Sequence, residues 1–261
     1  MVIHMQESVD SLFHYTDINA VCSIVKNRKI WLTNVGFLND SREFHDGMSV
    51  VADILNTYDL ENFSSIEQAK KVGYLKGLTD AYKVLPDVNM YTCSFSRAPN
   101  LLSQWRAYGN FAIEFSRLAL EKVGALYDCC YMPKEKEEIC RRSFELLAER
   151  QSRKPIGEYD PEPLRDFMLG LLALKNMHFR EEHEVRMVDT ATYEMTEVKF
   201  RSRGDFLIPY LEKEFGDNCI KALHIGPIAN QDLAKRSLDL LLRSCGLRDL
   251  PVYLSDIPFR S

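Results

Sequence analysis

The sequence predicts a single α+β domain, residues 1–261, built on a mixed or antiparallel sheet with helical insertions. Period-two strand patterns and helical apolar stripes are mixed along the chain, without the steady alternation of a parallel doubly wound sheet. No segment repeats with a period of 20–50 residues, which argues against a solenoid. The 261 residues are 46% hydrophobic, which is enough for one large core.

The N-terminal third supports this fold class element by element. Residues 11–15 read as a short strand, and Thr16 can cap the helix that follows, because its hydroxyl can accept a bond from an unpaired backbone N–H. Residues 29–35 alternate as a strand does. Asp40 and Glu43 then have the spacing of a capping box. They open a helical excursion that we expect over about 45–87.

The rest of the chain adds strands, helices and a second helical excursion at about 134–178. That excursion joins a charged helix, a proline-rich break and an apolar helix. Gly109 is expected to end a short helix in the usual C-terminal glycine position. The remaining expected strands are 88–96, 109–115, 126–132, 183–189 and 219–226, and the remaining helices are 100–108, 117–125 and 231–245.

Composition excludes some classes of function. The formal net charge of −5 gives no electrostatic footprint for duplex nucleic acid. No apolar run approaches the ~20 residues that span a bilayer, and the first residues do not resemble a signal peptide. The seven cysteines include no C-x-x-C pair. We therefore expect reduced thiols in a cytoplasmic protein, with no membrane association and no zinc site.

The segment "LFHYTDINAV" places polar residues where a strand meets a helix start. His14 and Thr16 share one face of the strand, and Tyr15 lies on the other. Polar groups beside a helix N-terminus suit an anionic or polar ligand. The alternative is a capped helix with a hydrogen-bonded histidine beside it.

Hydroxyl and aromatic residues form the next candidate group. Ser94 and Ser96 share one face of their strand, which is typical either of a site or of a solvated sheet face. Trp105 and Tyr108 are three residues apart on a helix. They either anchor the core or form an aromatic wall for a flat ring.

The run "FREEHEVRMV" is the most informative. Glu182, Glu184 and Arg186 alternate along a predicted strand, so they share one face. Two acids and a guanidinium are costly to bury unless they pair. They form either an exposed edge ladder or a site in which Arg186 holds Glu184 beside a second carboxylate. Such a carboxylate can stabilise positive charge on a sugar ring.

The chain resembles a bacterial family of domains of unknown function (number 2971). The resemblance rests on four runs in order, which cover about residues 12–230: "FHYTDINAVCSIVKNRKIWLTNVGFLNDSREF", "CSFSRAPNLLSQWRAYGNFAIEF", "FREEHEVRMV" and "HIGP".

A more distant likeness links the chain to the ADP-ribosyltransferases, which split the nicotinamide–ribose bond of NAD. Those enzymes place a histidine or arginine on one strand, a tyrosine or a serine-rich run on a second and an E-x-E motif on a later one. The resemblance implies an ADP-ribosyltransferase-like fold with NAD as substrate. It also implies that His14 holds the ribose, Ser94 or Ser96 supports the site, Trp105 or Tyr108 stacks on nicotinamide, and Glu184 polarises the ribose.

The resemblance therefore predicts an NAD-dependent ADP-ribosyltransferase or NAD glycohydrolase, with a role as a bacterial toxin or phage-defence effector. Its catalytic residues would be Glu184 and His14. The nucleotide would contact Tyr15, Thr16, Ser94, Ser96, Trp105, Tyr108, Glu182 and Arg186. The acceptor, a protein or a nucleic acid, is not identified. The alternatives are a non-catalytic ligand-binding or sensor module and a metal-dependent nuclease that uses His14, Asp40, Glu43 and Glu184.

Overall fold

A computed structural model describes residues 10–38, 89–154, 161–192 and 194–259, together with Asp53 and Gly73. The excursion expected over 45–87 lies outside these residues, apart from Asp53 and Gly73, which are helical. Asp40 and Glu43 also lie outside them.

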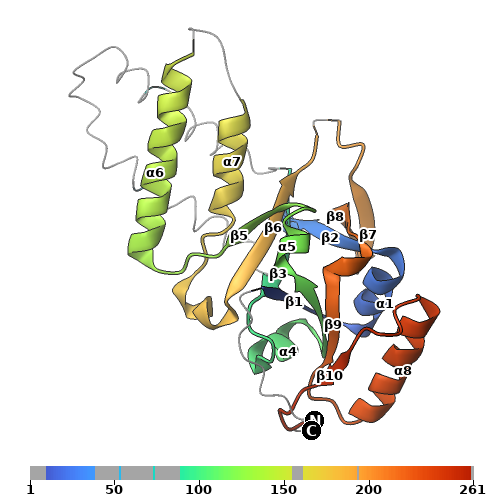
Figure 1. Ribbon diagram of the computed structural model, residues 1–261. Helices are drawn as coiled ribbons and strands as arrows, with labels where there is room; N and C mark the ends of the chain where they lie inside the picture. Colours follow the sequence, from blue (N-terminus) through green and yellow to red (C-terminus); the bar gives the residue numbers. More distant parts are fainter. Residues whose placement is uncertain are drawn as a thin grey trace.

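The described part of the chain is a mixed α/β structure around one ten-stranded sheet (Figure 1). The main path runs β10-β9-β4-β1-β3-β2-β8-β7, while β6 pairs with β3 and β5. Strands β9 and β10 pair in parallel, and every other strand pair is antiparallel. The strands are β1 (Ser11–Thr16), β2 (Lys29–Asn34), β3 (Met90–Ser96), β4 (Phe111–Ser116), β5 (Ala125–Asp128), β6 (Glu184–Thr190), β7 (Lys199–Arg203), β8 (Phe206–Glu214), β9 (Ile220–Ile225) and β10 (Val252–Leu254).

Helices and short 3₁₀ turns connect these strands. The α-helices are α1 (Ile18–Asn27), α4 (Leu102–Tyr108), α5 (Arg117–Leu120), α6 (Pro133–Ser152), α7 (Pro161–Leu171) and α8 (Gln231–Ser244). The 3₁₀ turns are η1 (Val35–Phe37), η2 (Met177–Glu182) and η3 (Asp217–Cys219).

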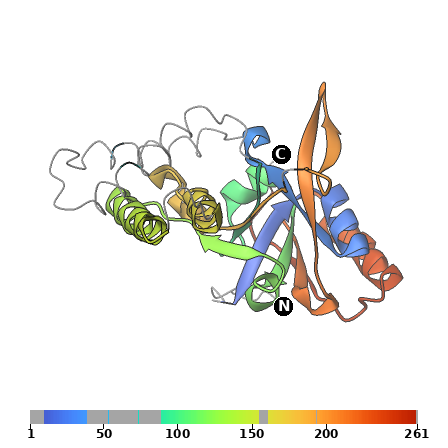
Figure 2. The same cartoon turned by 90° about the horizontal axis from the view of Figure 1, so that it is seen from above.

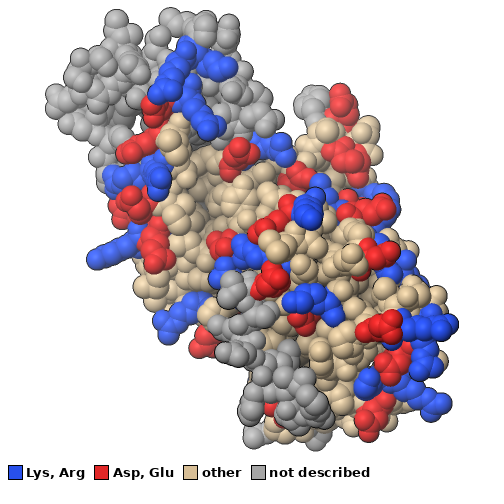
Figure 3. Space-filling model, viewed as in Figure 1, with Lys and Arg blue, Asp and Glu red and all other residues tan. Residues whose placement is uncertain are grey.

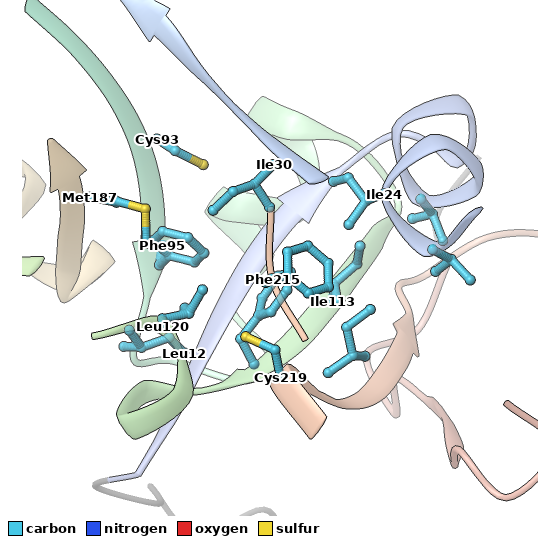
Figure 4. Close-up of a cluster of buried hydrophobic side chains, with 14 of the residues drawn as sticks. Leu12, Ile24, Ile30, Cys93, Phe95, Ile113, Leu120, Met187, Phe215 and Cys219 are labelled. Atoms are coloured by element: carbon cyan, nitrogen blue, oxygen red, sulfur yellow. The ribbon is translucent and has the colours of Figure 1, made fainter. Parts of the chain in front are cut away.

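The main core lies between the sheet and the pair α1 and α8, which flank the same side of the molecule (Figures 1 and 2). Helix α1 contributes Val21, Ile24 and Val25, and α8 contributes Leu238 and Leu242. Figure 4 shows part of this core, in which side chains from the strands pack against Ile24 of α1 and Leu120 of α5. The rings of Phe95, Phe115 and Phe215 meet edge to face at centroid distances of 5.8 and 5.5 Å. Such pairs add to the stabilisation from buried area.

The sheet splits along one edge of β3, and this split creates the site. At one end of β3, Ser96 pairs with Phe13 of β1. At the other end, Tyr91 and Thr92 pair with β2. Residues 93–95 lie between these two contacts, and neither β1 nor β2 pairs with them. The opposite edge of β3 is paired with β6 along its whole length.

Several boundaries differ from the sequence expectations. Asp17, not Thr16, caps α1: its carboxylate accepts a 2.9 Å bond from Ala20 N, and Thr16 is the last residue of β1. The helix expected over 117–125 ends at Leu120, and the strand expected over 126–132 ends at Asp128. The hairpin β7–β8 was not expected, although Gly204 and Asp205 at its turn are typical of a two-residue hairpin loop.

Helices α6 and α7 project from the sheet on the side away from α8 (Figures 1 and 2). The two ends of the α6–α7 excursion lie side by side where they join the sheet. Cys130 N donates to Ala173 O at 2.8 Å, and Lys175 N donates to Cys130 O at 3.0 Å. Of the helices in the described part of the chain, none has the length and apolar character that a bilayer crossing requires.

Candidate functional site

A pocket of about 190 Å³ opens where β1 and β2 diverge from β3. Strands β1, β2 and β3, helix α4 and the segment before β6 all contribute to its wall. Six of the residues expected from the sequence line it: His14, Tyr15, Ser94, Tyr108, Glu182 and Glu184. Residues separated by up to 170 positions in the chain therefore meet in one small space.

His14 bridges the split in the sheet. Its Nδ1 lies 2.9 Å from the backbone oxygen of Ser94, one of the residues that neither β1 nor β2 pairs with. Because a carbonyl only accepts, Nδ1 carries the proton and Nε2 is the acceptor nitrogen of a neutral ring. Burial lowers the pKa of His14, and the bond to Ser94 opposes this only in part. His14 thus supplies a neutral hydrogen-bond acceptor to the pocket.

Tyr15 holds the loop between β3 and α4 against the pocket. Its hydroxyl donates to Ala98 O at 2.5 Å and accepts from Leu101 N at 3.2 Å. Burial raises the pKa of this hydroxyl above its usual value. The hydroxyl is therefore committed to the loop, and the ring is what Tyr15 offers to the pocket.

Two carboxylates and two cations meet at one end of the pocket. Lys175 Nζ contacts the carboxylates of both Glu182 and Glu184. Arg186 binds Glu184 from the other side, with Nε 2.8 Å from Oε1. Burial alone would raise the pKa of Glu184, but Arg186 and Lys175 together lower it to about 2. Glu184 is consequently ionised at neutral pH although its side chain is only 6% exposed.

Ser96 and Arg186 support the pocket from behind and do not line it. The Ser96 hydroxyl donates to the backbone oxygen of Glu182 at 2.6 Å and so fixes the segment that carries Glu182. Arg186 is buried, and one of its guanidinium nitrogens lies 2.6 Å from Leu172 O. Both residues position the carboxylates and are shielded from a ligand.

The placement of Glu182 corrects the sequence expectation. Glu182 does not alternate on a strand with Glu184, because β6 begins only at Glu184. Glu182 ends the turn η2, and His183 follows in the left-handed region with φ 44°. The two carboxylates are brought together by Lys175, which the sequence reading missed. Lys175 follows the apolar helix of the excursion, and nothing in the sequence indicates that it is buried, with only 4% of its side chain exposed.

Of the other residues expected at the site, Trp105 and Thr16 do not line this pocket. Trp105 packs edge to face on Tyr15 at a centroid distance of 4.6 Å, and its other side covers Gly226. A Cβ at Gly226 would lie 2.8 Å from the Trp105 ring, so only glycine leaves room for it. Gln104, one position earlier on α4, lines the pocket with Tyr108, four residues on.

The other polar groups at the site limit its chemistry. Burial and the nearby Glu184 charge raise the pKa of the Cys93 thiol to about 12, so Cys93 is not a thiolate nucleophile at neutral pH. Within the described residues, no group of three or more histidine, cysteine or acidic side chains is placed to hold a metal ion. Of the four residues considered for a nuclease site, Asp40 and Glu43 lie outside that part of the chain.

Fold and site together define a mixed α/β protein with a small pocket at a split in its sheet. One end of this pocket carries ion-paired carboxylates, and a neutral histidine and a tyrosine line its wall. No family model matches the sequence, and no curated protein or solved structure is detectably similar to it.

Proposed function

We propose that the protein is an ADP-ribosyltransferase-like enzyme that cleaves NAD at the pocket in the split sheet. The observation that carries this proposal is the convergence of His14, Ser94, Tyr108 and the two carboxylates Glu182 and Glu184 on one pocket. The resemblance to the family of unknown function and to the ADP-ribosyltransferases is consistent with it. A role as a bacterial toxin or phage-defence effector in the cytoplasm belongs to the same proposal.

The pocket volume sets which part of NAD enters. Pockets that enclose a whole drug-sized ligand measure roughly 300–1,000 Å³. A volume of about 190 Å³ is smaller, so it accommodates the nicotinamide–ribose end and leaves the adenosine outside. This is the end at which the bond breaks.

The reaction needs orientation and a negative charge more than it needs a nucleophilic side chain. The bond between ribose C1′ and the nicotinamide nitrogen breaks, and nicotinamide leaves with the electron pair. The ribose becomes an oxocarbenium ion, which an acceptor or water then attacks with loss of a proton. Fixed carboxylates stabilise the developing cation.

Each pocket residue has a defined task in this proposal. His14, as a neutral acceptor, binds a ribose hydroxyl. Tyr108 is 45% exposed at the pocket and stacks on the nicotinamide ring. Glu184 stays ionised because of Arg186 and Lys175, and Glu182 places a second carboxylate beside it. Ser94 lines the opposite wall.

A non-catalytic binding module is the second candidate, and one observation favours it. Both oxygens of Glu184 already contact cations, Oε1 with Arg186 and Oε2 with Lys175. A carboxylate neutralised in this way has less charge to offer a developing cation. The same pocket would then hold a nucleotide without cleaving it.

The decisive experiment follows nicotinamide release from NAD by the purified full-length chain. Glu182→Gln and Glu184→Gln remove one carboxylate each, and Glu181→Gln is the matched control at an exposed neighbouring glutamate. We expect each pocket variant to lose about 10²-fold in turnover, the usual scale for one fixed electrostatic group. We expect Glu181→Gln to match the wild type.

Two results would contradict this proposal: the first would reject the enzyme, and the second would reject the catalytic role of its two carboxylates. Absence of nicotinamide release together with measurable NAD binding would support the binding module. Equal turnover in all three variants would remove both carboxylates from the chemistry. Thermal unfolding of each variant separates lost turnover from lost folding.

A further inference from the structure

Arg201 on β7 is a half-buried cation next to the pocket. Its guanidinium carbon lies 5.5 Å from the ring centroid of Trp31, and one of its nitrogens donates to the Thr33 hydroxyl at 3.1 Å. Trp31 and Thr33 both line the pocket. Stacking and the hydrogen bond therefore hold the guanidinium in one orientation at the pocket rim.

No carboxylate compensates this charge within the described residues. Arg28, Arg117 and Arg186 each pair with an acidic side chain, whereas Arg201 forms no ion pair there. Burial lowers the pKa of Arg201, and the neighbouring Arg203 adds to this effect. A desolvated guanidinium without an anion is a cost to folding that a bound anion would offset.

A buried hydroxyl lies beside it. Thr92 is 2% exposed, and its Oγ1 has no hydrogen-bond partner among the residues the structure describes. Thr92 lines the pocket and pairs with Thr33, whose hydroxyl binds Arg201. Buried hydroxyls are nearly always hydrogen-bonded, so a free one facing a pocket indicates a missing ligand.

The pocket therefore has carboxylates at one end, while Arg201, which does not itself line the pocket, lies against the lining residues Trp31 and Thr33 near the other end. Thr92 marks the Arg201 end of β3, and Ser96, which pairs with Glu184, marks the carboxylate end. Four residues of strand separate them, or about 13 Å. A ligand that spans both ends carries an anionic group at one end and a hydroxyl-rich or cationic group at the other.

We propose that Arg201, with the hydroxyl of Thr92, binds a phosphate-type anion at this end of the pocket. The guanidinium presents parallel N–H donors to two oxygens of the anion, which is a geometry that arginine favours over lysine. The Thr92 hydroxyl donates to a third oxygen. Identifying this anion as the diphosphate of NAD rests on the proposed function, but the anion site itself does not.

The test titrates inorganic pyrophosphate into the full-length chain by calorimetry at low ionic strength. We expect Arg201→Gln to weaken binding by about tenfold or more, the scale of losing charged hydrogen bonds. Arg201→Lys keeps the charge and is expected to recover part of the affinity. Arg236→Gln on α8 makes the same change of charge at an exposed position and is expected to bind as the wild type does.

The outcomes separate this proposal from the proposed function. Wild type that does not bind pyrophosphate, or Arg201→Gln that binds as well as Arg236→Gln, would overturn the anion site. Pyrophosphate binding that depends on Arg201 would support it, even if nicotinamide is never released. Should Arg201→Gln fail to fold by circular dichroism, Thr92→Val decides: an unchanged affinity would reject the site.

Discussion

Glu184 shows how a single residue links stability to the site. It is ionised although buried, because Arg186 and Lys175 hold it between them. Removing one member of such a buried group leaves uncompensated charge and typically costs 3–5 kcal/mol. The same contacts that keep Glu184 ionised therefore also stabilise the fold, and a variant at this position changes both.

We predict a pH-dependent contribution from this residue. The pKa of Glu184 falls from 4.5 to about 2 on folding, and each unit corresponds to about 1.4 kcal/mol. Between these values the unfolded chain binds more protons than the folded one, so stability rises with pH. The contribution, about 3 kcal/mol, is fully present above pH 4.5 and is lost as the pH falls towards 2.

Urea unfolding of the wild type and of Glu184→Gln between pH 7 and pH 3 measures this contribution. We expect the variant to be less stable at pH 7 and the difference in unfolding free energy to shrink as the pH falls. A difference that stays constant over this range would show that Glu184 titrates normally. Glu181→Gln, at an exposed site, is the control and is expected to follow the wild type.

At the scale of elements, the α6–α7 excursion depends on the body of the protein. Helix α6 is strongly charged, and Cys140 is the buried residue among its described side chains. The other buried residues among the described side chains of the excursion gather near its return to the body, at 168, 169 and 171–175. Lys175 lies there, in contact with Glu182 and Glu184.

We therefore predict that a fragment of residues 134–178 does not fold alone. Two helices alone bury too little apolar surface to offset the entropy of ordering the chain. Circular dichroism of the fragment should show little helix and no cooperative melting, with the full-length chain as the control. A cooperative transition in the fragment would identify the excursion as a domain of its own.

At the scale of the whole molecule, the net charge and one face of the surface give no sign of a strongly basic region. On the face in Figure 3, basic and acidic side chains of the described residues are interspersed. The formal net charge is −5. A mixed, mildly acidic surface gives no general attraction for a phosphate backbone. Anion recognition would have to come from a local site, such as that at Arg201.

The thiols give a prediction for the molecule as a whole. None of the seven cysteines forms a disulfide, and Cys93, Cys140 and Cys219 are buried. Burial raises the pKa of Cys93 to about 12 and the pKa values of Cys140 and Cys219 to about 11. Because the thiolate is the reactive form, these three should react last with a thiol reagent at pH 8.

Titration with a chromogenic disulfide measures the order of reaction. In denaturant without reductant, seven thiols should react. In the native state, the half-buried Cys22, Cys129, Cys130 and Cys245 should react before the other three. A count below seven in denaturant would reveal a disulfide, and early loss of Cys93 by peptide mapping would contradict its burial.

Local pattern by itself determined most of the elements. The spacing of apolar residues predicts the strands β1, β2, β3 and β9 by alternation and the helices α1 and α8 by helical periodicity. It does so because each of these elements buries one face against a common core. The mixed α/β class follows from the same patterns. The pairing of Glu184 with Arg186 was also readable, since residues two apart on a strand share a face.

Tertiary structure alone decided how the pocket is assembled. The split beside β3 arises from the pairing of three distant strands, and no local pattern specifies which strands pair. Lys175 contacts Glu184 because the turn η2 between them folds the chain back. Arg201, in the β7–β8 hairpin, contacts Thr33, which lies 168 residues earlier in the chain. Trp105 packs behind the pocket because Gly226 leaves space for its ring. Such contacts depend on how elements pack in three dimensions, whereas periodicity reports only which face of each element is buried.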